Sequence, residues 1–188
     1  MAKYYDIDDI LAEEEVVPTV FKKEAVGVEQ IDSGDDSNKV EAGSKVELPY
    51  WLASELYLRN VVSITIPSCY ERKSRTREEI GADPAHVDLR SRCLYFYEFG
   101  SKIARLVGDK TIGPLLLVAF RARYKDVLIK ALTAALAVPP KYLSILTKEE
   151  TKLYEAGQSS TAAFKKWRIG GPRLQRASLL GKKRKPIE

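Results

Sequence analysis

The strongest hydrophobic periodicity lies in the second half of the chain, where it predicts three helices. Between residues 96 and 106, apolar side chains recur at i, i+3, i+7 and i+10, the spacing of one helix face. A second helix is predicted from Pro114 to the residue before Pro139. The third is predicted to open at the capping box formed by Thr147 and Glu150 and to stop at Gly-Gly-Pro from residue 170.

Shorter apolar runs in the first half predict strands and two short helices. The β-branched, partly alternating runs are residues 16–21, 26–31 and 61–67. Acidic residues favour a short helix at 6–15, which we expect Pro18 to stop. A further amphipathic helix is predicted at 48–56, with Pro49 at its first helical position. Residues 32–38 are a polar turn cluster.

These patterns predict an α+β chain that is mainly α. A small N-terminal β-rich domain with short helices (1–67) precedes a linker or solvated helical turn (68–82). A C-terminal helical-bundle domain (83–180) is expected to open at Asp83-Pro84, and a basic tail (181–188) follows it.

The predicted helices carry more apolar surface than three helices can bury among themselves. Residues 115–120 are apolar around more than one face of the second helix. A partner helix bundle is the simplest cover for this surface, and burial against the β-rich module is the alternative. Gly100 lies in the middle of the first helix, where it costs about 1 kcal/mol relative to alanine and suggests close approach of a neighbour.

Charge is divided unequally along the chain. Residues 1–42 carry a net charge of −8, so the remainder carries +13 within a total of +5. The last residues form a compact basic cluster, Lys182, Lys183, Arg184 and Lys185. Nuclear import and nonspecific phosphate contact are both open to this cluster, and the lack of interleaved aromatic residues favours import. A small basic nucleic-acid-binding module is therefore the alternative to a protein-contact subunit.

Residue supply argues against catalysis. His86 is the only histidine, and Cys69 and Cys93 form no CxxC pair, so the sequence predicts neither a metal site nor a disulfide framework. Phosphate-cradling glycine motifs are missing, and we expect no cofactor and no enzymatic activity. The longest uncharged apolar stretch, 115–120, is too short for a bilayer span, which favours a soluble protein in a reducing compartment.

Four segments together resemble a known family. They are Tyr5-Asp6-Ile7-Asp8-Asp9-Ile10-Leu11, Gly43-Ser44-Lys45-Val46-Glu47-Leu48-Pro49-Tyr50-Trp51-Leu52-Ala53, Ala82-Asp83-Pro84 with Val87-Asp88-Leu89, and Phe96-Tyr97-Glu98-Phe99-Gly100-Ser101. In this order and spacing they resemble the third Psf subunits of the GINS complex of eukaryotic DNA replication. The Lys-Lys-Arg-Lys end is similar too.

The resemblance implies a noncatalytic scaffold in a nuclear heterotetramer of four related subunits. Each such subunit has a helical and a small β-rich domain, and in this family the β-rich domain comes first. The family joins an Mcm hexamer and a RecJ-like Cdc protein in the replicative helicase, which serves initiation and fork progression, with DNA contact indirect or weak. On this resemblance the predicted subunit-interface residues are Phe96, Phe99, Ile103, Leu117, Phe120, Tyr124 and Leu128.

Overall fold

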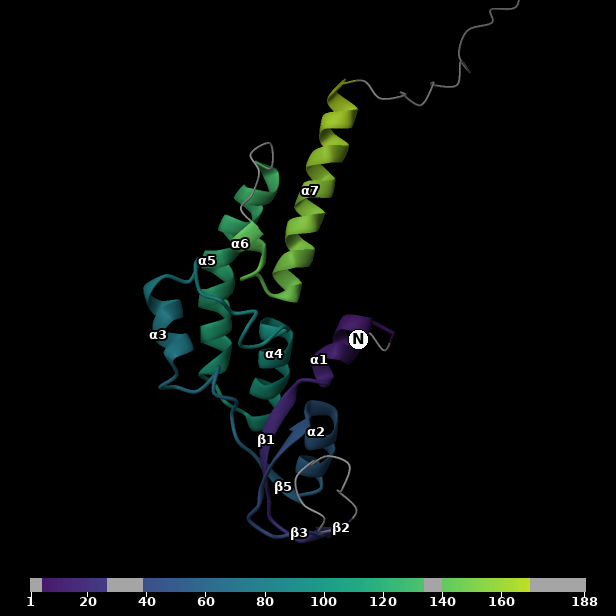
Figure 1. The fold of residues 1–188 in the computed structure, drawn as a ribbon, viewed down its shortest axis with the longest axis vertical. Coiled ribbons are helices and arrows are strands. Elements are labelled where there is room, and N and C mark those ends of the chain that lie inside the picture. The colour runs from purple at the N-terminus through teal and green to yellow at the C-terminus, as the bar shows by residue number, and fades with distance from the viewer. Residues whose placement is uncertain (1–4, 27–38, 134–139, 170–188) are drawn as a thin grey trace, which may run out of the picture.

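The computed structural model describes residues 5–26, 39–133 and 140–169. Its N-terminal part contains α1 (Ile7–Glu13), β1 (Val16–Phe21), β2 (Ala25–Val26), β3 (Lys39–Val40), β4 (Lys45–Pro49), α2 (Tyr50–Leu58) and β5 (Val62–Ile64). The helical part contains α3 (Arg75–Ala82), α4 (Phe96–Val107), α5 (Ile112–Leu132), α6 (Pro140–Leu143) and α7 (Lys148–Ile169). The strands gather at one end of the molecule and α7 projects from the other (Figure 1), so the α+β, mainly helical prediction is confirmed.

A three-stranded antiparallel sheet forms the centre of the N-terminal part. Its strand order is β4-β1-β5, with Val17 opposite Leu48 and Thr19 opposite Ile64. Because side chains alternate along a strand, Val17, Thr19 and Phe21 are all buried on one face. The Thr19 hydroxyl donates a 2.7 Å hydrogen bond to the Val46 carbonyl, which satisfies this buried polar group.

Strand β1 has the predicted bounds, but its surroundings differ from the prediction. Pro18 lies inside β1, and α1 ends at Glu13 without its help. Strand β4 was not predicted, and the helix predicted at 48–56 overlaps its end. That helix begins at Tyr50, and Pro49 occupies the N-cap instead of the first helical position. Of the predicted strand 26–31, only Val26 is described, as part of β2.

Helix α2 ends in a Schellman motif centred on Asn60. This residue has a φ of 57°, in the left-handed region that asparagine tolerates better than most residues. The Val61 amide donates to the Leu56 carbonyl, and the Asn60 amide donates to the Tyr57 carbonyl. These bonds satisfy carbonyls at the helix end and turn the chain into β5.

The range predicted as a linker or solvated helical turn, 68–82, contains α3. Ser74 caps this helix by accepting a hydrogen bond from the Arg77 amide at 3.2 Å. No helix opens at Asp83, which is instead the C-cap of α3. Its carboxylate accepts from the Ala85 amide and pairs with His86, so the predicted capping signal here forms a local turn.

One apolar core runs through both parts of the chain. It joins residues of α1 and the sheet, such as Ala12 and Val17, to residues of α4 and α5, such as Phe96 and Ala119. Tyr70 lies fully buried in this core, where its ring contacts Phe96 at a centroid distance of 5.1 Å. The two parts therefore bury their apolar surface jointly.

Ion pairs hold α1 against the helical part. Lys102 of α4 lies 2.6 Å from Asp9 and 2.7 Å from Glu13. Burial alone would lower the pKa of Lys102, but its hydrogen bonds to these two carboxylates outweigh that effect and leave the pKa raised. Asp8 pairs with Lys152 of α7 and accepts a bond from the Tyr95 hydroxyl. Thus α1 connects the sheet to both α4 and α7.

Replacing Gly100 by alanine should destabilise the fold. A Cβ added at Gly100 would lie 2.9 Å from the Tyr70 ring and 3.0 Å from a Leu116 methyl. This confirms the close approach of a neighbour that the sequence predicted at Gly100. We expect Gly100→Ala to lower the free energy of unfolding by about 1–3 kcal/mol, despite the better helix propensity of alanine. Urea denaturation would measure this change.

The matched control is Gly81→Ala in α3, where nothing lies within 4 Å of an added Cβ. This variant should gain about 0.5–1 kcal/mol from helix propensity alone. Equal effects of the two substitutions would contradict the close approach at Gly100.

Candidate subunit-contact surface

Helix α5 has a buried line of side chains that contains one charged residue. The buried positions are Ile112, Leu115, Leu116, Ala119, Arg123, Val127 and Ala131. Their spacing of three and four residues keeps them on one helix face. Residues before Arg123 belong to the large apolar core, and those after it belong to a second cluster with Leu146 and Tyr154. Arg123 therefore forms a polar layer between two apolar clusters.

All five N–H groups of the Arg123 guanidinium have acceptors. Nε and one terminal nitrogen donate to the two carboxylate oxygens of Glu150 at 2.6 and 2.8 Å. The remaining bonds reach the carbonyls of Pro84, Val87 and Ile145. Burial alone would lower the pKa of Arg123, but the bonds and the charge of Glu150 keep it raised.

Glu150 also completes the predicted capping box of α7. Its carboxylate accepts from the Thr147 amide at 3.1 Å, and its own amide donates to the Thr147 hydroxyl at 3.3 Å. The Tyr97 hydroxyl of α4 donates to the same carboxylate at 2.7 Å. The capping-box prediction is confirmed, and this one carboxylate connects α4, α5 and α7.

Neighbouring Glu149 caps a different helix. One oxygen of its carboxylate accepts from the amides of Tyr97 and Glu98, both at 3.1 Å, in the first turn of α4. Burial raises the pKa of Glu149, against the opposing effect of its hydrogen bonds. Two adjacent glutamates thus hold the start of α7 against α4 and α5.

These contacts make α5 and α7 run parallel. Arg123 of α5 faces Glu150 of α7. Eight residues further along α5, the Ala131 methyl faces Gly157 of α7, where a Cβ added to the glycine would lie only 2.8 Å from this methyl. Beyond Gly157, residues 158–169 are exposed apart from half-buried Thr161. Figure 1 shows this end of α7 extending past α5. The last eleven residues extend about 16 Å at the rise of an α-helix. We call residues 159–169 the α7 overhang.

Several apolar side chains of α5 are exposed, alongside the exposed Arg121 and Lys125. Leu117, Phe120 and Tyr124 are 48%, 44% and 39% exposed. The Phe120 ring lies between those of Tyr97 and Tyr124, with centroid distances of 5.7 and 5.2 Å. Val118 and Ile129 extend the exposed apolar surface around the helix. We call Leu117, Val118, Phe120, Tyr124 and Ile129 the α5 stripe.

The α7 overhang adds exposed aromatic residues to this surface. Phe164 and Trp167 stack with their ring centroids 5.7 Å apart, and Ile169 is 84% exposed. Exposed apolar patches of this kind commonly mark protein contact sites. The arrangement can therefore bind another apolar helix or helices.

The predicted interface residues separate into two groups. Phe96, Phe99 and Ile103 are buried in the core that the chain forms by itself, so the prediction that they contact other subunits is corrected. Periodicity alone does not tell an inner helix face from an outer one. Here the rings of Phe96 and Phe99 pack against Tyr70, and Phe99 also contacts Tyr50 of α2.

The other predicted interface residues lie on α5. Leu117, Phe120 and Tyr124 are exposed, and Leu128 is half-buried beside Gly157. The predicted nuclear localisation residues Lys182, Lys183, Arg184 and Lys185 lie outside the described residues.

Sequence reasoning missed Arg123 as a structural residue. The available signal was its position, four places from both Ala119 and Val127 on the same helix face. Its partner could not be found this way. The overhang was missed because helix length alone does not show where the neighbouring helix ends.

Other kinds of site find little support among residues 5–26, 39–133 and 140–169. Within these ranges no group of three or more His, Cys, Asp or Glu residues is placed to hold a metal ion. None of the helices there is long and apolar enough to cross a membrane. Cys69 and Cys93 are unpaired and buried, and burial raises the pKa of Cys69 to about 12, which disfavours the reactive thiolate.

Breaking the buried ion pair should strongly destabilise the chain. Glu150→Ala leaves the Arg123 charge buried without its partner, which costs about 3–5 kcal/mol. Exposed Glu155 on the same helix is the control, and Glu155→Ala should change the free energy of unfolding by less than about 0.5 kcal/mol. Chemical denaturation of both variants would measure the difference. If Glu150→Ala lowered the free energy of unfolding by less than about 1 kcal/mol, the helical part would not depend on this ion pair.

Two protein-family models match the chain. The PSF3 N-terminal domain matches residues 5–58, and the GINS complex protein helical bundle domain matches residues 72–169. The second match covers α3 to α7, including Arg123, Glu150 and the α5 stripe.

Several curated relatives are similar over most of the chain. The Xenopus laevis protein named DNA replication complex GINS protein PSF3 is 30% identical over 171 residues, covering 89% of this chain and 80% of the relative. The Schizosaccharomyces pombe protein named DNA replication complex GINS protein psf3 is 35% identical over 120 residues, covering 64% and 68%.

A Dictyostelium discoideum protein named "Probable DNA replication complex GINS protein PSF3" is 30% identical to this chain over 164 residues. The aligned region covers 87% of this chain and 61% of that relative's length. The two domain matches and these identities agree with the resemblance carried by the four sequence segments. The chain belongs to the PSF3 family of GINS complex subunits.

Proposed function

We propose that this chain is a noncatalytic scaffold subunit of a heterotetrameric GINS complex that acts in chromosomal DNA replication in the nucleus. In this proposal the complex joins an Mcm hexamer and a RecJ-like Cdc protein in the replicative helicase. It would serve both initiation and fork progression by holding these proteins in position. The basic tail, residues 181–188, would serve nuclear import.

The observation that carries the proposal is the exposed apolar surface of α5 and α7. The α5 stripe exposes five apolar side chains between Leu117 and Ile129, and the α7 overhang carries stacked Phe164 and Trp167. Burying one large apolar side chain contributes about 1.5–3 kcal/mol, so several together support a stable contact with partner subunits.

Two features support a noncatalytic role. His86 is exposed and pairs with Asp83 at 2.8 Å in a surface turn. The buried carboxylates Glu149 and Glu150 are both committed to backbone amides, and Glu150 also to Arg123. Carboxylates held in this way stabilise structure.

Phe120→Asp should prevent assembly with partner subunits. The substitution places a charge in the middle of the α5 stripe, and desolvating an unpaired carboxylate at an interface costs several kcal/mol. We expect a tagged wild-type chain to recover its companion subunits from a nuclear extract and the variant to lose them, as measured by mass spectrometry of the purified material.

The matched control is Leu58→Asp at the end of α2. Leu58 is another apolar residue with 68% exposure, and it lies on the N-terminal part. It should retain the companions. Recovery of the same companions by Phe120→Asp, with an unchanged melting temperature, would argue that the α5 stripe is not the contact surface.

A nucleic-acid-binding module is the second candidate function. The α7 overhang supports it, because Lys165, Lys166 and Arg168 surround the stacked aromatic residues. Base stacking on aromatic side chains beside basic residues is a common mode of single-strand binding.

This second function predicts that single-stranded DNA affinity survives deletion of residues 181–188 and falls steeply with salt. Trp167→Ala should then weaken binding by about 1–3 kcal/mol in fluorescence titration. If the affinity for single-stranded DNA disappeared on deletion of residues 181–188, or were unchanged in Trp167→Ala, the nucleic-acid-binding function would be contradicted.

A further inference from the structure

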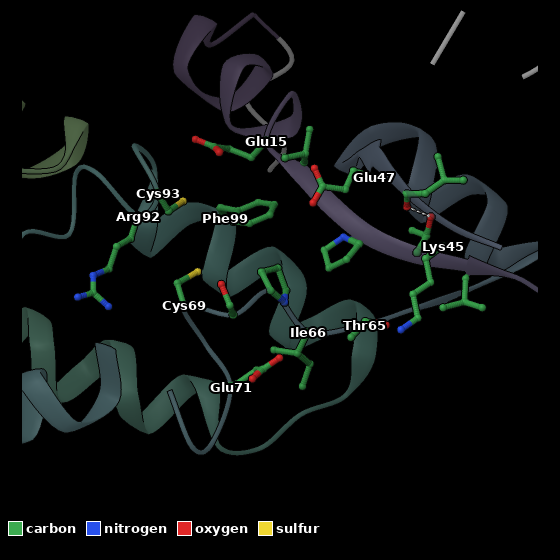
Figure 2. A pocket seen from close by; sticks show the side chains of 17 residues that line it. Glu15, Lys45, Glu47, Thr65, Ile66, Cys69, Glu71, Arg92, Cys93 and Phe99 are labelled. Atoms are coloured by element: carbon green, nitrogen blue, oxygen red, sulfur yellow. Dashed lines mark hydrogen bonds between the residues drawn. The ribbon is translucent and has the colours of Figure 1, made fainter. Parts of the chain in front are cut away.

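A cavity of about 620 Å³ lies between the sheet and the helical part. Figure 2 shows its walls. The outward face of β1 and part of β4 form one side, the connection after β5 forms another, and Cys69, Cys93 and Phe99 close the inner end. This volume is within the range of ligand-binding sites in proteins.

Pro18 lies beside the cavity, at the point where the pairing of β5 with β1 ends. Strand β5 pairs with β1 only from Ile64 backwards, and the last bond runs from the Thr65 amide to the Pro18 carbonyl at 2.9 Å. Proline has no N–H, so it cannot donate to a longer β5. The chain from Ile66 onwards therefore leaves the edge of β1, and residues 66–69 line the cavity.

The uncovered face of β1 is apolar. Val16 is 52% exposed, and Pro18 and Val20 are half-buried, whereas the alternate residues of β1 lie in the core. Half-buried Ile66 adds an apolar side chain from the connection after β5. The cavity thus has an apolar floor that no other described element covers.

The walls of the cavity are acidic. In Figure 2 the carboxylates of Glu47 and Glu71 point towards the space between the walls. Both residues are exposed, and among the described residues neither carboxylate has a hydrogen-bond or ion-pair partner. They come from β4 and from the connection to α3, so they approach the cavity from different sides.

The positive charges near the cavity do not cancel this pair. Figure 2 shows the Arg92 guanidinium turned away from the cavity, where it lies 2.6 Å from Glu79. Lys45 is the one lining cation without such a partner among the described residues, and Figure 2 shows it beside Thr65 at one end. Glu15, a third acidic residue, points away and accepts bonds from backbone amides of Leu94 and Tyr95. Glu47 and Glu71 therefore leave a net negative charge.

We propose that this cavity receives a lysine or arginine side chain from an extended segment of another protein. The apolar stem would pack on Pro18 and Ile66, and the cationic head would lie between Glu47 and Glu71. Such a combination of apolar stem and charged head fits both features of the cavity, whereas a fully apolar or acidic segment fits only one or neither. The proposal does not depend on the α5 stripe.

A defined peptide tests the proposal. The probe is a fluorescein-labelled hexapeptide of alternating valine and arginine, titrated by fluorescence anisotropy against the full chain co-purified with its companions. We expect saturable binding that weakens by about tenfold or more in the double variant Glu47→Gln/Glu71→Gln, because two charge-assisted contacts are lost. The matched double variant Glu55→Gln/Glu155→Gln removes two exposed carboxylates of α2 and α7 that do not line the cavity, and it should bind as the wild type does.

Three results would overturn the proposal. They are no binding of the valine–arginine peptide, equal binding of a valine–glutamate peptide, or equal weakening in the control variant. The first would leave the cavity without this ligand, the second would make the contact purely apolar, and the third would attribute it to long-range charge. Recovery of the companions during purification is read separately, so failure of this inference and failure of the scaffold function remain distinguishable.

Discussion

The helical part depends on one buried ion pair, Arg123 with Glu150. A buried guanidinium is tolerated only when its donors are satisfied, and here they reach α7 and three backbone carbonyls from two loops. Glu150 in turn holds Tyr97 of α4 and the first turn of α7. Because the pair fixes the start of α7 beside the middle of α5, the chain must return through α6 before α7 runs parallel to α5.

This arrangement decides which apolar surface remains outside. The pair and the apolar line around it occupy the inner face of α5, and no element among residues 5–26, 39–133 and 140–169 buries the α5 stripe. Starting α7 opposite Arg123 also makes it extend past α5, which exposes Phe164 and Trp167. The core that the chain forms by itself buries Phe96 and Phe99 of α4, whereas Leu117, Phe120 and Tyr124 of the α5 stripe remain exposed.

Sequence patterns predicted what depends on neighbouring residues. The bounds of β1, the capping box at Thr147 and the close approach at Gly100 all follow from local chemistry, and all are confirmed. Strand β4 and the irregular stretch after Asp83 were missed because distant partners determine them. Phe96 and Phe99 were assigned to the wrong face for the same reason: periodicity identifies a helix face, but only the tertiary structure shows what that face meets.

The two proposed contact regions differ in physical character, and this difference bears on their roles. The α5 stripe and the α7 overhang present large aromatic and aliphatic side chains, whose burial gives stable contacts that depend little on salt. The cavity beside Pro18 presents a small apolar floor and two exposed carboxylates, whose contribution is weaker and is screened by salt. A chain with both can remain permanently assembled through one surface while it exchanges a second, charged partner at the other.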